Sequence, residues 1–180
     1  MIELVLGGVR SGKSRYAESV VKQLPAPWIY LATGQAWDAE MQERIVRHQA
    51  DRGEGWRTVE EPLELADALV AAEDAPVLVD CLTLWLTNLL MAERDISVAK
   101  KRLLDALSDR KALTVLVGNE VGLGIVPENA LARRFRDEAG WLHQAIAAQA
   151  RKVVLSVAGV PCVIKDTSTA CRQLSTEHEP

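Results

Sequence analysis

Cysteine is scarce in this 180-residue chain, which has three: Cys81, Cys162 and Cys171. An odd number without C-x-x-C spacing disfavours both a disulfide framework and a structural zinc site. Long hydrophobic runs are missing as well, because no apolar stretch approaches the roughly 18 residues that a membrane-spanning helix needs. We therefore expect no stable membrane insertion.

An excess of positive charge is also absent, since the formal net charge at pH 7 is -4. A chain without a basic field is a poor candidate for binding nucleic acid. A predicted strand begins at the second residue and leaves no room for a signal peptide, so the expected location is the cytoplasm. The apolar fraction of 48% and the charged fraction of 26% are typical of globular proteins, and the length suits a single domain.

The most informative stretch is a phosphate-binding loop between a predicted strand and a predicted helix. Residues 7–14, Gly-Gly-Val-Arg-Ser-Gly-Lys-Ser, match the pattern G-x-x-x-x-G-K-[ST] at every fixed position. The glycines let successive N–H groups turn towards a phosphate, and the following helix points its N-terminal dipole at the same anion. We predict a nucleoside triphosphate site in which Lys13 reaches the β- and γ-phosphates and the Ser14 hydroxyl binds Mg²⁺. The alternative is a plain glycine-rich turn.

A second predicted strand ends in a carboxylate. Residues 76–80, Pro-Val-Leu-Val-Asp, form a continuous apolar run that finishes at Asp80, which is the form of a Walker B strand. In that interpretation Asp80 lies beside the phosphate loop and holds Mg²⁺ directly or through water. The alternative is an aspartate that caps the next helix.

Strands and helices alternate from end to end of the sequence. Strands are expected at residues 2–6, 28–32, 76–80, 113–117 and 152–157, with a short extended piece at 162–165 and an irregular or briefly extended one at 56–60. Helices are expected at residues 15–24, 38–50, 82–93, 98–107 and 130–150, with another that begins at Pro62. Residues 1–165 thus form one domain, and residues 166–180, which lack periodicity, are predicted to be a mobile tail.

This alternation predicts an α/β fold of the P-loop NTPase kind, with a doubly wound, mostly parallel sheet and helices on both faces. Ligands of such sheets bind outside the carboxyl ends of the strands. Four short segments follow directly on predicted strands: residues 12–13, residues 33–34, Asp80, and residues 118–120. We expect them to share one rim of the sheet.

His48 admits a further hypothesis. A neutral imidazole is a competent nucleophile near pH 7 and could attack the α-phosphorus of a nucleotide to give a covalent nucleotidyl-histidine. A histidine at helical spacing from Met41 and Ile45 is more often a partly buried packing residue. The residues alone leave both interpretations open.

Several segments taken together resemble the bifunctional adenosylcobinamide kinase/adenosylcobinamide-phosphate guanylyltransferases. They are residues 7–14, 44–48 (Arg-Ile-Val-Arg-His), 56–60 with Pro62, 87–90, 119–129 (Asn-Glu-Val-Gly-Leu-Gly-Ile-Val-Pro-Glu-Asn), 133–140 and 158–161. The resemblance extends in order to about residue 165. It departs from the family pattern at His143, where the family often has asparagine, and at Arg47, where a second histidine can stand.

The resemblance implies two reactions. A nucleoside triphosphate, ATP or GTP, phosphorylates the aminopropanol hydroxyl of adenosylcobinamide. GMP then passes from GTP to adenosylcobinamide phosphate, through a phosphoramidate on the histidine that is His48 here, and pyrophosphate is released. Two alternatives stay open: a P-loop kinase of another small alcohol, with His48 structural, and a nucleotide-binding regulatory module without turnover.

The resemblance also implies site residues and an assembly. The guanine nucleotide would be contacted by Gly7, Gly8, Val9, Arg10, Ser11, Gly12, Lys13, Ser14, Thr33, Gly34, Gln35, Gln49, Ala50, Asp51, Arg52, Glu60 and Asp80. Ser14 and Asp80 would hold Mg²⁺. The sequence does not identify the residues that contact cobinamide, for which residues 120–129 are only a guess. The fold would resemble the nucleotide-binding core of recombination ATPases, and the chain would form a homo-oligomer, since members of the family can assemble as trimers.

Overall fold

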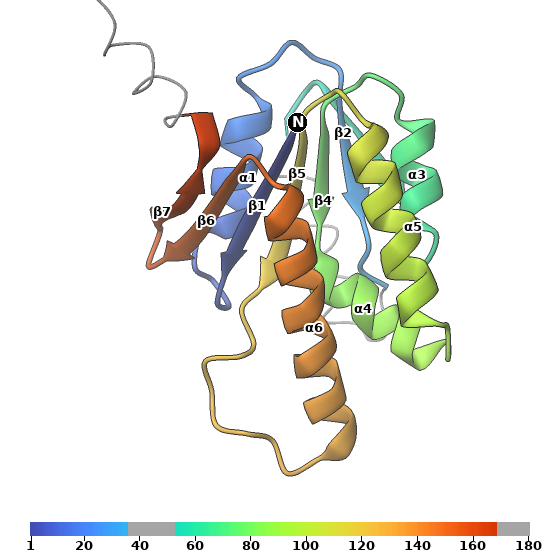
Figure 1. Ribbon diagram of the computed structural model, residues 1–180. Helices are drawn as coiled ribbons and strands as arrows, with labels where there is room; N and C mark the ends of the chain where they lie inside the picture. Colours follow the sequence, from blue (N-terminus) through green and yellow to red (C-terminus); the bar gives the residue numbers. More distant parts are fainter. Residues whose placement is uncertain (36–52, 169–180) are drawn as a thin grey trace, which may run out of the picture.

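A seven-stranded sheet in the order β3-β2-β4-β5-β1-β6-β7 forms the centre of the molecule (Figure 1). This is a computed structural model, and it describes residues 1–35 and 53–168. The strands are β1 (Ile2–Gly7), β2 (Trp28–Ala32), β3 (Trp56–Glu60), β4 (Val77–Asp80), β5 (Thr114–Asn119), β6 (Lys152–Val157) and β7 (Val160–Asp166). The helices are α1 (Lys13–Val21), α3 (Leu65–Ala71), α4 (Leu82–Met91), α5 (Ile96–Asp109) and α6 (Ala130–Gln149).

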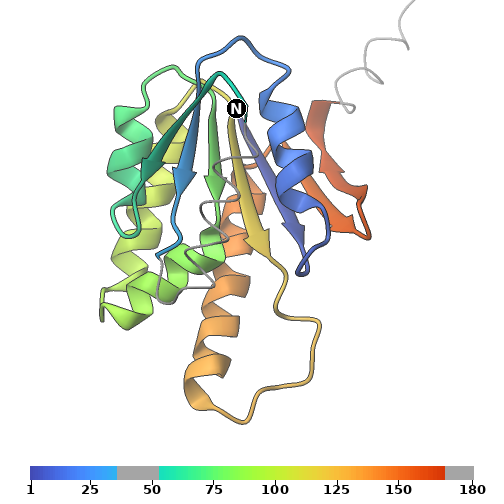
Figure 2. The same cartoon turned by 180° about the vertical axis from the view of Figure 1, so that it is seen from behind.

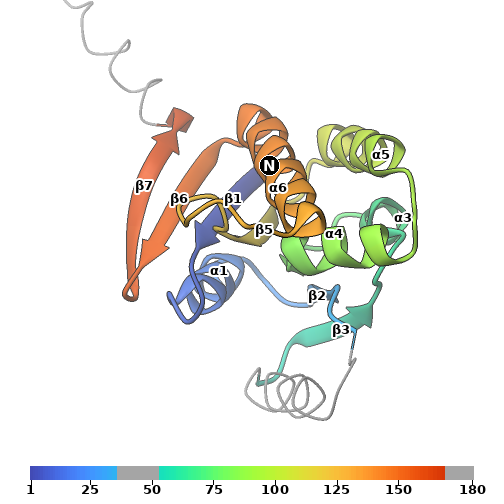
Figure 3. The same ribbon diagram turned by 90° about the horizontal axis from the view of Figure 1, so that it is seen from below.

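All strand pairs are parallel except β6 and β7, which pair antiparallel. Viewed from below, α1 lies on one face of the sheet, and α3, α4, α5 and α6 lie on the other (Figure 3). Adjacent residues of β1 pack on opposite faces of the sheet. Leu4 packs with the larger group of helices, whereas Val5 packs with Ala17 and Val21 of α1. The predicted fold class, a mostly parallel sheet covered on both faces, is confirmed.

Two element boundaries differ from the sequence prediction for local reasons. Helix α3 begins at Leu65 rather than at Pro62, because the Glu61 carboxylate accepts the N–H groups of Leu63 and Glu64 at 2.9 and 2.8 Å and forms a turn there. Helix α5 begins before the predicted residue 98, since the Asp95 side chain caps its first turn.

Two segments that the sequence predicts to be only irregular or briefly extended are strands in the structure. Residues 56–60 form β3 at one edge of the sheet, and the extended piece at 162–165 belongs to β7 at the other edge. The predicted helix at 38–50 lies outside the described residues, and so does the predicted tail (166–180) from residue 169 onward. The first residue of that tail, Asp166, instead ends β7, and the Thr167 N–H donates to the Arg151 carbonyl at 3.0 Å. Within residues 1–35 and 53–168, no helix has the length and apolar character to cross a membrane.

The parallel register places the predicted ligand-binding segments along one rim. Glu60 aligns with Ala32, Ala32 with Asp80, Asp80 with Val117, and Val117 with Val5, two residues before the phosphate loop starts. The carboxyl ends of these strands therefore meet at the same edge, and the prediction of a shared rim is confirmed.

Candidate nucleotide-binding site

The phosphate loop, residues 7–14, connects the end of β1 to the start of α1. Gly12 is the N-cap of α1 and has a φ of 88°, and a Cβ there would lie 3.0 Å from the Cα of Gly159. This position therefore requires glycine both for its backbone angle and for its space. No side chain caps α1, and its first turn carries no acidic residue, so the positive end of the helix faces the loop without a competing anion.

The β6–β7 hairpin supports the loop from beside it. The Ser11 carbonyl accepts hydrogen bonds from Ser156 Oγ at 2.7 Å and from the Gly159 N–H at 2.9 Å. Both turn residues of the hairpin, Ala158 and Gly159, have positive φ, which is the geometry of a two-residue type I′ turn. Only the family resemblance marks the turn segment in the sequence, and no local pattern marks Ser156.

Lys13 lies over the loop that precedes it. Its ammonium nitrogen donates to the Gly8 carbonyl at 3.0 Å. Residues Gly8, Val9 and Arg10 are exposed, whereas Gly7 and Ser11 are buried beneath them. The exposed part of the loop thus carries the backbone groups and the cation that a phosphate needs, above a buried base.

Asp80 ends β4 at the same rim. Its Oδ2 accepts a hydrogen bond from the Tyr30 hydroxyl at 3.0 Å, which fixes the direction of the carboxylate. Tyr30 is buried in β2, and its ring meets Trp56 of β3 edge-on, with the ring centroids 6.0 Å apart. Sequence reasoning did not identify Tyr30, since the two partners are 50 residues apart in the chain.

Thr33 joins the end of β2 to the start of α4. Its buried hydroxyl accepts from the Cys81 N–H at 2.8 Å and donates to the Cys81 carbonyl at 2.7 Å. Its own carbonyl accepts from the Asn88 side chain at 2.7 Å. Burial raises the pKa of the Cys81 thiol, and the adjacent Asp80 carboxylate raises it further, so this cysteine is a packing group rather than a nucleophile.

The other predicted contacts are divided between the rim and the undescribed segment. Gly34 and Gln35 follow Thr33 at the end of β2, and Glu60 is exposed at the end of β3. His48 and residues 49–52 (Gln49, Ala50, Asp51 and Arg52) lie outside the described residues. The structure therefore brings together the phosphate loop, residues 33–35, Glu60 and Asp80 at one rim. The hypothesis that His48 is a nucleophile stays a prediction.

The end of β5 closes the other side of the phosphate loop. The Glu120 N–H donates to the Gly7 carbonyl at 3.0 Å. Behind it, His143 of α6 packs against Gly118 so closely that a Cβ on Gly118 would lie 2.6 Å from the imidazole Nε2. Burial lowers the pKa of His143 to about 4, opposed by the Glu120 charge, so this imidazole is neutral at pH 7.

The oxygen ligands at this rim suit Mg²⁺ bound with a nucleotide. Mg²⁺ is usually held by one or two protein oxygens together with substrate phosphates and water. Ser14 supplies a hydroxyl at the start of α1, and Asp80 supplies an oriented carboxylate. Among the described residues, no cluster of three or more histidine, cysteine, aspartate or glutamate side chains could hold a metal ion by itself.

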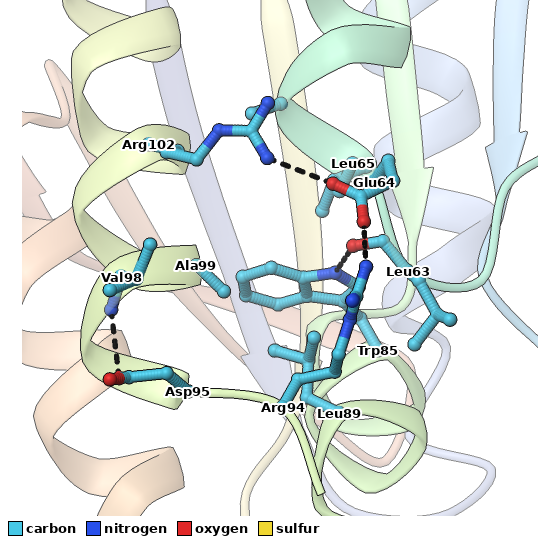
Figure 4. Close-up of a pocket in the computed structure, with 11 residues that line it drawn as sticks. Leu63, Glu64, Leu65, Trp85, Leu89, Arg94, Asp95, Val98, Ala99 and Arg102 are labelled. Carbon is cyan, nitrogen blue, oxygen red and sulfur yellow. Dashed lines mark hydrogen bonds and ion pairs between the residues drawn. The ribbon is translucent and has the colours of Figure 1, made fainter. Parts of the chain in front are cut away.

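A cavity of about 260 Å³ lies between α3, α4 and α5 (Figure 4). Trp85 lines it and donates its indole N–H to the Leu63 carbonyl at 2.8 Å. At its edge the Glu64 carboxylate pairs with both Arg94 and Arg102. None of the phosphate-loop residues lines this cavity, so it is separate from the nucleotide site.

The parallel sheet, the loop at the end of β1 and the carboxylate at the end of β4 define a P-loop nucleotide-binding protein of the α/β class. Solved structures show the same fold at low sequence identity. The PH0250 protein of Pyrococcus horikoshii has a TM-score of 0.52 and 11% identity, with 92% of this chain and 86% of that chain covered. An ATPase from a bacterial type III secretion system has a TM-score of 0.51 and 10% identity, with 90% and 56% covered.

The chain belongs to the CobU family, described as cobinamide kinase / cobinamide phosphate guanyltransferase, whose model matches residues 3–164. The bifunctional adenosylcobalamin biosynthesis protein CobP of Pseudomonas aeruginosa is 48% identical over 169 residues, which cover 92% of this chain and 98% of that protein. The bifunctional protein CobU of Salmonella typhimurium is 44% identical over 183 residues, covering 92% and 100%. The family predicted from the motifs is confirmed.

Proposed function

We propose that this chain phosphorylates adenosylcobinamide and then transfers GMP from GTP to the product. The observation that carries the proposal is the placement of a complete phosphate loop and the Tyr30-oriented Asp80 carboxylate on one rim, in a chain of the cobinamide kinase / guanyltransferase family. Both reactions cleave a phosphoanhydride bond of a nucleoside triphosphate, so one phosphate site can serve both.

In the kinase step the aminopropanol hydroxyl of adenosylcobinamide attacks the γ-phosphorus of ATP or GTP. The new O–P bond forms as the bond to the β-phosphate oxygen breaks, ADP or GDP leaves, and the hydroxyl proton is released to solvent. Lys13 would exchange its contact with the Gly8 carbonyl for the phosphates, and Ser14 and Asp80 would hold Mg²⁺. The metal, when bound, neutralises charge on the transferred group.

In the guanylyl step an imidazole nitrogen of His48 attacks the α-phosphorus of GTP and pyrophosphate leaves. The phosphate of adenosylcobinamide phosphate then attacks the same phosphorus, the N–P bond breaks, and adenosylcobinamide-GDP forms. The phosphate loop would bind the β- and γ-phosphates that leave as pyrophosphate. The phosphate loop would thus bind phosphate groups in both reactions, while His48 would act only in the second.

The remaining contacts follow from the family resemblance. Gly7 to Ser14, residues 33–35, residues 49–52, Glu60 and Asp80 would surround the guanine nucleotide. Thr33 would hold the backbone that leads into Gly34 and Gln35, because its hydroxyl is bonded to Cys81, its carbonyl to the Asn88 amide and its N–H to the Asp80 carbonyl. We also propose that the chain works in the cytoplasm as a homo-oligomer, with the trimer as the expected state.

The experiment is to incubate the protein with GTP labelled at the α-phosphorus and to look for label on the protein. A phosphoramidate is stable in alkali and labile in acid, so a label with those properties is expected on the wild-type chain. His48→Ala should abolish it. His178→Ala is the matched control, because the chain has three histidines and His178 has no assigned role.

Separate assays of the kinase and guanylyl transfer activities distinguish the role of His48 from that of Lys13. His48→Ala should retain phosphorylation of adenosylcobinamide, whereas Lys13→Ala should reduce both reactions by about 100-fold or more, since each depends on the phosphate loop. An unlabelled wild-type protein that still makes adenosylcobinamide-GDP would remove the covalent intermediate. Equal loss of the kinase step in His48→Ala would give the histidine a positioning role in both.

A further inference from the structure

The loop between β5 and α6, residues 120–129, presents a group of aliphatic side chains to water. Leu123, Ile125 and Val126 are 85%, 97% and 59% exposed. Single exposed aliphatic residues are common, but three within four positions of one loop mark an interaction surface. Figure 2 shows this loop extending beyond the carboxyl ends of the strands, clear of the sheet and of the other helices. We call these three side chains the aliphatic tip.

Side chains next to the tip hold the loop at both ends. On the β5 side, the Glu120 carboxylate accepts the N–H groups of Gly122 and Leu123 at 2.8 and 3.1 Å. On the α6 side, Arg133 donates to the carbonyls of Pro127, at 2.9 Å, and Glu128. The exposed tip is therefore displayed by a braced loop, and a ligand that binds it has less conformational entropy to remove.

The base of the loop contacts the phosphate site directly. The backbone N–H of Glu120 donates to the carbonyl of Gly7, the first residue of the phosphate loop, at 3.0 Å. A molecule seated on the tip would therefore lie at the same rim as a bound nucleotide. Its bulk could rest on the loop while a flexible arm reaches the γ-phosphorus.

We propose that the aliphatic tip binds the corrin ring of cobinamide; this rests on the proposed function and names the part of the chain that holds the acceptor. The reacting group of cobinamide is one small arm, and a site that bound only that arm would gain little binding energy for positioning it. The macrocycle is large, its faces are hydrocarbon-rich and its rim carries amides. An aliphatic surface suits the faces and leaves the amides in water. A second copy of this chain is the other candidate occupant, but self-association would not require a loop whose base adjoins the phosphate loop.

The test is the double variant Leu123→Ser with Ile125→Ser, compared with the wild-type chain. Both residues are exposed, so the fold should be retained. Equilibrium dialysis against cobinamide should show weakening by about tenfold or more, the loss expected when two aliphatic contacts are removed from a binding site. The KM for adenosylcobinamide in the kinase assay should rise by the same factor, while the KM for GTP and the kcat at saturation stay within about twofold.

Val163→Ser with Ile164→Ser is the matched control, because these side chains are 55% and 62% exposed on the edge strand β7. It should leave cobinamide binding and turnover unchanged. Unchanged cobinamide affinity in the loop variant would overturn the proposal. If that variant instead changes the oligomeric state in sedimentation velocity while its cobinamide affinity is unaltered, the tip is a contact between copies.

Failure of the proposed function has a different signature. A wild-type chain that binds GTP but neither phosphorylates nor guanylylates a cobinamide would refute the reaction. If that chain still bound cobinamide in dialysis, and the loop variant did not, the corrin site would survive without the reaction. If the wild-type chain bound no cobinamide at all, both proposals would fall together.

Discussion

The hydrogen bond from Tyr30 to Asp80 orients the carboxylate that we propose as a ligand of Mg²⁺. Tyr30→Phe removes one hydroxyl and leaves Asp80 Oδ2 without this donor. We expect kcat/KM for the kinase reaction to fall by about tenfold and the Mg²⁺ concentration for half-maximal rate to rise, because the carboxylate must be ordered when the metal binds. The Mg²⁺ dependence of the rate at saturating nucleotide is the measurement.

Tyr16→Phe is the natural control, since Tyr16 and Tyr30 are the two tyrosines of the chain. It should leave the Mg²⁺ dependence unchanged. A Tyr30→Phe protein that lost stability but kept the wild-type Mg²⁺ dependence would show that the hydroxyl serves packing alone. In that case the orientation of Asp80 would have to come from the backbone.

At the scale of elements, the antiparallel hairpin of β6 and β7 fixes the phosphate loop. Ser156→Ala removes the 2.7 Å hydrogen bond to the Ser11 carbonyl and leaves the Gly159 N–H as the remaining donor. We expect a loss of about 1 kcal/mol in the free energy of unfolding and a several-fold weaker nucleotide affinity. Urea unfolding and titration with a fluorescent GTP analogue would measure the two effects.

Ser19→Ala provides the comparison for the hairpin prediction. The Ser19 hydroxyl also donates to a backbone carbonyl, that of Tyr16 at 2.7 Å, but it is exposed on α1. Its removal should change neither quantity beyond experimental error. Nucleotide affinity that is unaffected in Ser156→Ala would mean that the loop keeps its shape without the hairpin.

The strands and the phosphate loop could be predicted from the sequence, whereas the side-chain contacts between distant elements could not. Parallel strands such as β4 and β5 are continuous apolar runs, and the phosphate loop is a local pattern of glycines, so both can be recognised from neighbouring residues. Ser156 and Tyr30 act on partners 145 and 50 residues away, and no local pattern marks such pairs. The edge strand β3 was uncertain for a related reason: it is short and mostly exposed, so its pairing with β2 leaves little hydrophobic periodicity.

For the molecule as a whole, His143 connects α6 to the sheet and should make the stability of the fold depend on pH. Its imidazole lies against Gly118 of β5, and burial lowers its pKa from 6.5 to about 4. Between these two values the unfolded chain binds a proton that the folded chain does not. Stability is therefore complete above pH 6.5 and decreases as the pH falls towards 4.

The size of this effect follows from the two pKa values. Lowering the pH from 7 to 5 should reduce the free energy of unfolding by about 2 kcal/mol through His143 alone, and the full difference in pKa corresponds to about 3 kcal/mol. His143→Gln keeps a polar side chain but cannot titrate. Its unfolding free energy should therefore fall less than that of the wild-type chain over the same interval.

Urea denaturation followed by tryptophan fluorescence at pH 7 and pH 5 measures the difference, because every other titrating group contributes to both proteins and cancels. His178→Ala is the histidine control and should retain the wild-type pH dependence. Parallel losses of stability in wild type and His143→Gln would show that the imidazole gains a proton in the folded state as readily as in the unfolded one. The packing of α6 on Gly118 would then have to open to water at pH 5, and hydrogen exchange along α6 at that pH would detect it.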